Sequence, residues 1–189
     1  IVFGDWSSDV CSSDLVSCGT CMDQLLKYQF EQIFPGCRLL DVHEYLMEKG
    51  VKMQQANKPG YLYHDPCHSP IKQHNPLEVA AQLMGSEVRL SDRCCGEAGT
   101  LGVSRPDIAN QLRFRKQQEL QDGIRALRGT ERITSDEVRL LTSCPACKQG
   151  LNRYRDDTGL RVSYMVEELA RDSMGPEGQR EIVTRLLNG

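Results

Sequence analysis

The chain has 189 residues, and its 23 Lys and Arg against 26 Asp and Glu give a formal net charge of −3, so it lacks the basic field that a nucleic-acid partner requires. With 39% hydrophobic and 26% charged residues it has the composition of a globular protein, and its apolar runs are far shorter than the roughly 20 residues of a transmembrane helix. We therefore expect one or two compact domains, no nucleic-acid partner and no transmembrane segment.

The first fifteen residues differ in character from the rest. They begin with Ile1 and contain neither the basic nor the apolar segment of a secretory signal. From Asp5 to Leu15 they resemble a sequencing adapter translated in frame, although a genuine serine-rich tail is the alternative. We therefore set residues 1–15 aside as a non-native segment, exclude Cys11 from the native cysteines, and expect the chain to be a fragment of a longer protein.

Beyond that segment, short apolar strands alternate with helices. Strands are predicted at residues 38–43, 61–64, 88–90, 137–142 and near 162. Helices are predicted at residues 21–34, 44–49, 75–84 and 104–127, and after Cys147 and the last strand. Asn75 and Ser104 are expected to cap two of these helices, and Gly85 to end the first of the two. The alternation predicts an α/β fold with a mainly parallel sheet flanked by helices.

Three cysteine groups each follow a predicted strand. They are Cys67, the pair Cys94-Cys95 after 26 further residues, and Cys144-x-x-Cys147 after another 48. The carboxyl ends of parallel strands meet at one edge of a sheet, so these groups are expected to converge there. One closed zinc site uses four ligands, and five thiols therefore indicate more than one metal atom. The side chains of Arg93, Lys148 and Arg153 are expected to offset the negative charge of the thiolates.

An internal repeat divides the chain. The motif Cys18-Gly-Thr-Cys21 and the segments after it resemble the stretch from Cys144 onward, at an offset of 144 minus 18, or 126 residues. We interpret residues 16–58 as the tail of a first unit and 59–189 as a second, complete unit with a C-terminal helix. Chance similarity between two cysteine-helix-strand-helix stretches is the alternative.

Three stretches of the sequence resemble the cysteine-rich CCG domain family. They are His64-Asp-Pro-Cys67-His68, Cys94-Cys-Gly-Glu-Ala-Gly-Thr100 and Cys144-x-x-Cys147. That family includes a subunit of heterodisulfide reductase, the iron-sulfur subunit of glycolate oxidase and lactate-type iron-sulfur dehydrogenases. The resemblance implies that Cys67, Cys94, Cys95, Cys144 and Cys147 hold an iron-sulfur cluster of [4Fe-4S] type, which is noncubane in heterodisulfide reductase. It also implies that Cys18 and Cys21 belonged to the metal site of the first unit, with zinc as one occupant. The family's spacings are nearer thirty residues than the 26 and 48 found here.

We also predict roles for the residues around the cysteines. We expect Gly96 and Gly99 to let backbone N–H groups approach the cluster sulfurs, or to serve only the turn. His64 and His68 flank Cys67, where histidines can donate hydrogen bonds to cluster sulfurs or carry protons. For His64 we favour a hydrogen bond at a strand end, and for Glu97 a solvated charge rather than a proton relay. The basic side chains Arg113, Arg115 and Lys116 are expected to form a solvated face. Cys37 is expected to be a buried apolar residue rather than a ligand.

The resemblance implies an electron-transfer module of a flavin-dependent 2-hydroxy acid dehydrogenase, acting on D-lactate or glycolate. FAD would then lie on an upstream part, ferredoxin-like domains or subunits would be partners, and a quinone or a protein would accept the electrons. We expect no catalytic residue on this chain alone, and we expect a cytoplasmic location that allows peripheral association with the inner membrane face. The alternatives are a catalytic subunit of heterodisulfide-reductase type, a structural zinc module and, least favoured, dithiol exchange at Cys144 and Cys147.

Overall fold

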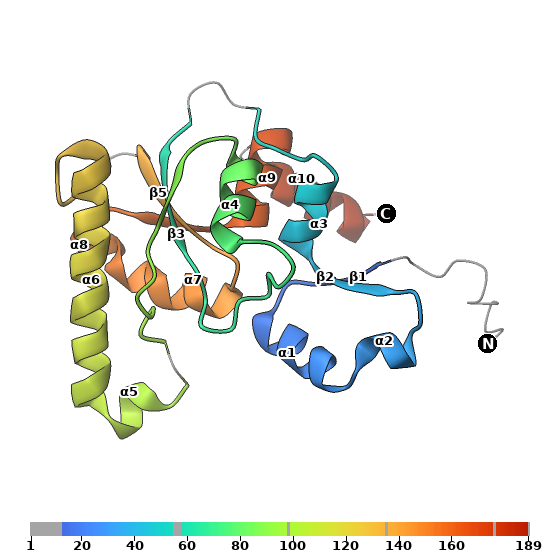
Figure 1. The fold of residues 1–189 in the computed structure, drawn as a ribbon. Coiled ribbons are helices and arrows are strands. Elements are labelled where there is room, and N and C mark those ends of the chain that lie inside the picture. The colour runs from blue at the N-terminus through green and yellow to red at the C-terminus, as the bar shows by residue number, and fades with distance from the viewer. Residues whose placement is uncertain (1–12, 55–57, 98, 135, 176, 189) are drawn as a thin grey trace.

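The computed structural model describes residues 13–54, 58–97, 99–134, 136–175 and 177–188, so Cys11 and most of the segment that was set aside lie outside the described residues (Figure 1). A two-stranded parallel sheet is formed by β1 (Ser13–Val16) and β2 (Arg38–Asp41). A four-stranded parallel sheet has the order β4 (Val88–Leu90), β3 (Gly60–His64), β5 (Val138–Thr142) and β6 (Arg161–Tyr164). Helices flank both sheets, which confirms the predicted α/β class.

The helices follow the predicted order with local differences. The strand predicted at residues 38–43 ends at Asp41, and the helix predicted from residue 44 begins at Val42. Their bounds are α1 (Gly19–Lys27), α2 (Phe30–Ile33), α3 (Val42–Glu48), α4 (Pro76–Met84), α5 (Leu101–Ser104), α6 (Pro106–Arg128), α7 (Pro145–Leu151), α8 (Arg155–Thr158), α9 (Met165–Met174) and α10 (Gly178–Asn188). The helix predicted up to residue 34 is broken, because Gln29 adopts a left-handed conformation with φ 54°. Ser104 does not cap α6; its hydroxyl donates to the Thr100 carbonyl within α5.

Asn75 caps α4 as predicted. Its side-chain oxygen accepts hydrogen bonds from the backbone N–H groups of Leu77 and Glu78 at 2.9 and 3.3 Å, and Gly85 ends the helix in the left-handed conformation.

The first strand differs from expectation in another way: β1 contains residues 13–15, which belong to the stretch expected to be non-native, and they pair in register with β2.

The strand order creates a switch point between β3 and β5. After β3 the chain crosses to β4 on one side, and after β4 it returns through α5 and α6 to β5 on the other side of β3. Connections that leave neighbouring strands in opposite directions open a crevice at the strands' carboxyl ends. Cys67 and Cys144 follow the two strands that border this crevice.

Two hydrophobic cores cover the two faces of the larger sheet. Tyr61 and Tyr63 face the core built with α4 and α9, whereas Leu62 faces the core built with α6 and α7. Successive side chains of a strand point to opposite faces, so His64 lies on the same face as Leu62, toward α6 and α7. In Figure 1, α6 runs along the opposite side of the molecule from β1, β2, α1 and α2.

The tail before residue 59 packs directly against the larger unit. The Glu44 carboxylate at the start of α3 accepts backbone hydrogen bonds from three consecutive residues, Lys72, Gln73 and His74, at 3.1, 2.6 and 2.9 Å. The tail repeats the local order of the larger unit, since β1–α1–β2–α3 corresponds to β5–α7–β6–α9. Among the described helices, none combines the length and the apolar composition needed to cross a bilayer.

Candidate metal centre

The predicted cysteine groups converge on one cavity of about 620 Å³ at the carboxyl ends of β3, β4 and β5. Six cysteines line it: Cys18, Cys67, Cys94, Cys95, Cys144 and Cys147. Five of these cysteines were predicted to converge because each group follows a strand of a parallel sheet. They come from three segments separated by 26 and 48 residues. All five cysteines predicted as ligands in residues 59–189 therefore surround a single space, together with Cys18 but not Cys21.

Local backbone geometry presents the thiols to the cavity. Cys144 is the extended N-cap residue of α7, and Pro145 occupies the first helical position, so the helix begins within the motif itself. Beyond β4, Gly96 has φ 76°, and its N–H lies 3.4 Å from the sulfur of Cys94. A Cβ atom there would lie 3.1 Å from the side chain of Arg113, so the turn favours glycine. Gly99 also lines the cavity.

One buried pair of sulfurs has the separation expected for two ligands of one metal atom. The Sγ atoms of Cys95 and Cys147 lie 3.6 Å apart, and both residues are buried. Two sulfurs bound tetrahedrally at about 2.3 Å from one metal would lie about 3.8 Å apart. The pair can thus bind one metal atom without rearrangement of the backbone.

The pKa values of these thiols depend on their neighbours in the cavity. A hydrogen bond with Cys147, and after it the neighbouring His64 ring, lower the pKa of Cys95 to about 4, against the opposing effect of burial. A hydrogen bond with Cys147, together with backbone N–H groups at the start of α7, lowers the pKa of Cys144 to about 6. Hydrogen bonding with Cys144 and Cys95 raises the pKa of Cys147. Clustered thiols of this kind favour thiolate at two positions, which is the form that binds metal.

Cys67 belongs to the same cluster of thiols. Burial raises the pKa of the Cys67 thiol, and the neighbouring side chain of Cys94 raises it further. Cys67 is nevertheless among the exposed cysteines, whereas Cys94 is half-buried, so this edge of the cavity faces solvent.

Cys18 lies in the same cavity as the five cysteines of the second unit, although the internal repeat predicted a separate first-unit site for it. Gly19 makes this approach possible, because a Cβ atom at that position would lie only 1.6 Å from the carbonyl oxygen of His68. Cys21 is exposed, and a hydrogen bond with Cys18 raises its pKa. The two thiols are thus neighbours, and of the two only Cys18 lines the cavity.

The two histidines beside Cys67 have different environments. His64 is fully buried, and its Nδ1 lies 3.3 Å from both the Ser91 carbonyl oxygen and the Lys116 ammonium, so the tautomer decides which of the two it bonds. One ring nitrogen of His64 lies within 4.8 Å of the sulfurs of Cys95 and Cys147. His68 is exposed, and its Nδ1 lies 2.7 Å from a carboxylate oxygen of Asp23 in α1.

The charges near the thiols differ from the sequence-based expectation. Lys148 and Arg153 form ion pairs with Glu167 and Glu97. The prediction that Lys116 is solvated is wrong, since its side chain is 0% exposed. The helical periodicity of the sequence could have predicted that Lys116 is buried. Lys116, Leu120 and Ile124 follow one another at four-residue intervals on the buried face of α6.

Cys37 is buried as predicted. It packs in a small cluster with Met22, Phe30 and Leu39 beneath the two-stranded sheet, away from the cavity. It does not line the space shared by the other cysteines.

Comparison with known proteins gives two matches to family models. A model described as CCG, cysteine-rich domain, matches residues 61–152, and a model described as a domain of unknown function, DUF3400, matches residues 152–189. No solved structure shows a significant match to the chain.

Several methanogen proteins are similar to the chain. An uncharacterized iron-sulfur protein of Methanococcus maripaludis is 25% identical over 139 residues, which are 68% of this chain and 26% of that protein. A subunit of dihydromethanophenazine:CoB–CoM heterodisulfide reductase from Methanosarcina mazei is 28% identical over 141 residues, 67% of this chain and 31% of that protein. A subunit of fumarate reductase (CoM/CoB) from Methanothermobacter marburgensis is 25% identical over 143 residues, 71% of this chain and 27% of that protein. The chain thus spans between a quarter and a third of the length of these curated relatives.

Proposed function

We propose that the chain binds an iron-sulfur cluster and transfers electrons within a larger oxidoreductase, since its residues 61–152 match the model of the cysteine-rich CCG domain. The observation that carries this proposal is the convergence of thiols from three strand ends on one cavity at the switch point of a parallel sheet. Relatives named as iron-sulfur proteins and as reductase subunits support it.

The proposed ligands are Cys67, Cys94, Cys95, Cys144 and Cys147. Five thiols exceed the four that one closed zinc site uses, which favours a multinuclear centre of [4Fe-4S] type, cubane or noncubane. The unpartnered ring nitrogen of buried His64, close to two of the sulfurs, also fits a group that accepts hydrogen bonds. The N–H of Gly96, and the turn at Gly99, would supply further hydrogen bonds to sulfur.

The partners in this proposal are a flavin-containing part that oxidises a 2-hydroxy acid such as D-lactate or glycolate, and ferredoxin-like domains that pass its electrons on. A quinone or a protein would accept them. Residues 16–58 would be the tail of a preceding unit, with Cys18 and Cys21 as remnants of its metal site, zinc included. Thiolate clusters persist in a reducing compartment, and on that ground we propose the cytoplasm.

Metal analysis tests the proposal. Anaerobic reconstitution of the chain with iron and sulfide should give several iron atoms and a matching amount of acid-labile sulfide per chain. Iron and sulfide near zero with one zinc per chain would instead establish a structural zinc module. Zinc found together with iron, and lost in Cys21→Ala alone, would assign the zinc to Cys18 and Cys21.

A second candidate function is reduction of a disulfide at the cluster itself. The size of the cavity, the exposure of Cys67 at its edge, and the similarity to a heterodisulfide reductase subunit favour it. Each disulfide would take two electrons and two protons and release two thiols, with the electrons supplied one at a time through the cluster.

This candidate predicts that the iron-loaded, dithionite-reduced chain converts the heterodisulfide of coenzymes M and B to free thiols. Thiol release is measured after excess dithionite has been removed, with the iron-free chain as the control. Reoxidation by a quinone analogue without any thiol release from the heterodisulfide would contradict disulfide reduction and leave electron transfer as the function.

A further inference from the structure

A buried lysine lies next to His64, behind the cysteines. The ammonium of Lys116 is within hydrogen-bond distance of the Ser91 hydroxyl (2.7 Å), the Glu119 carboxylate (2.8 Å), the Ser91 carbonyl (3.1 Å) and Nδ1 of His64 (3.3 Å). Its side chain is 0% exposed. Burying a lysine ammonium costs free energy unless each of its three N–H groups donates a hydrogen bond. Here four acceptor atoms surround the three N–H groups.

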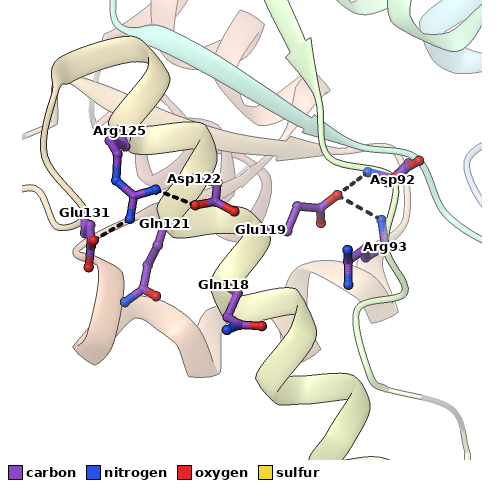
Figure 2. A pocket seen from close by; sticks show the side chains of 8 residues that line it. All are labelled: Asp92, Arg93, Gln118, Glu119, Gln121, Asp122, Arg125 and Glu131. Atoms are coloured by element: carbon purple, nitrogen blue, oxygen red, sulfur yellow. Dashed lines mark hydrogen bonds and ion pairs between the residues drawn. The ribbon is translucent and has the colours of Figure 1, made fainter.

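The Glu119 carboxylate holds this ammonium in place. Burial lowers the pKa of Lys116, and the hydrogen bond with Glu119 opposes that effect. Glu119 itself accepts backbone hydrogen bonds from Asp92 and Arg93 at 3.0 and 3.2 Å, as Figure 2 shows. It lines a polar hollow of about 560 Å³ on α6 together with Asp122, and its charge opposes the effect of burial on the pKa of Lys116.

The position of the ammonium selects one tautomer of His64. A proton on Nδ1 would lie beside a positive charge, whereas a lone pair on Nδ1 accepts from it. The Ser91 carbonyl is also 3.3 Å from Nδ1 but already lies 3.1 Å from the Lys116 ammonium. The proton of the neutral ring therefore sits on Nε2, which has no hydrogen-bond partner in the described part of the chain.

We propose that Lys116 is a positioning residue that holds His64 with its Nε2–H directed at the sulfur of Cys95. The inference rests on the proposed function, in which Cys95 is a cluster ligand. A hydrogen bond to a ligand sulfur stabilises the reduced, more negative cluster and so raises its reduction potential. It also excludes His64 as a ligand, because a protonated Nε2 has no lone pair for a metal.

Redox titration of the iron-loaded full chain, followed by EPR, tests this role. Lys116→Met should make reduction about tenfold less favourable, which is about 59 mV for one electron. His64→Leu should shift the potential in the same direction, and His64→Gln should recover part of the shift because its amide still donates. The matched control is Arg115→Met, which removes the same charge from the neighbouring, exposed position of α6 and should leave the potential unchanged.

A second set of measurements keeps the inference falsifiable where a variant folds poorly. Lys116→Met/Glu119→Gln removes both buried charges together and should show the same loss of potential as Lys116→Met. In the iron-free wild-type chain, ¹⁵N shifts of the His64 ring should report a proton on Nε2.

An unchanged potential in Lys116→Met with full iron content would overturn the inference, as would a protonated Nδ1. Strong ¹⁴N coupling from a directly bound His64 would also overturn it. Absence of iron from the wild-type chain would instead contradict the proposed function.

Discussion

Replacing Cys95 with alanine should remove nearly all iron and acid-labile sulfide from the chain. Cys95 is buried, its sulfur lies 3.6 Å from that of Cys147, and His64 is another close neighbour. Loss of a residue that hydrogen-bonds a metal ligand lowers metal affinity roughly 10–100-fold. Loss of a ligand itself should lower the affinity further. Iron and sulfide content per chain, together with the visible absorption of the reconstituted protein, measure the effect.

Cys37→Ala is the matched control for this prediction. It removes another buried thiol, but from the small core beneath the two-stranded sheet, and should leave the iron content unchanged. Circular dichroism would establish that both variants are folded. Full iron content in folded Cys95→Ala would contradict the ligand set, whereas equal loss in both variants would point to a general defect in folding.

Glu44→Ala should lower the free energy of unfolding by about 3 kcal/mol, because three part-buried backbone N–H donors lose their acceptor at roughly 1 kcal/mol each, the low end of the cost for a buried donor. The Glu44 side chain is fully buried and accepts backbone hydrogen bonds from Lys72, Gln73 and His74. Its other oxygen accepts from the N–H of Asp41 at 3.4 Å and completes the capping box of α3. Urea denaturation of the iron-loaded chain measures the change.

The control for Glu44 is Glu31→Ala. Glu31 is exposed on α2 of the same tail, and its loss should change stability by no more than about 0.5 kcal/mol. Glu44→Gln keeps one acceptor oxygen and should lie between the two. If Glu44→Ala were as stable as Glu31→Ala, the attachment of the tail to residues 72–74 would not depend on this carboxylate.

The fold could be predicted from local signals that are strong in this sequence. The strand at residues 61–64 is short, apolar and followed at once by Asp65-Pro66, and Asn75 and Gly85 mark the two ends of α4 through specific backbone hydrogen bonds. Convergence of the cysteines followed from the geometry of parallel strands, which places the residues after each strand at one edge.

The remaining features depend on contacts that local sequence does not encode. The break at Gln29 requires a left-handed residue that is not glycine, which is uncommon. Cys18 reaches the cavity because Gly19 packs against the distant loop that contains His68. The charge of Lys116 predicts exposure to solvent, whereas its helical phase with Leu120 and Ile124 places it on the buried face.

The close packing of Gly19 on the His68 carbonyl has a consequence for where the functional unit begins. Cys18, Gly19 and Thr20 form one wall of the cavity, yet they precede the region matched by the CCG family, which starts at residue 61. A protein trimmed to that family boundary would keep all five proposed ligands and lose the wall. The proposed ligands would then be more exposed to dissolved oxygen, so a cluster bound at this site should be lost faster in air from the trimmed protein than from the full chain.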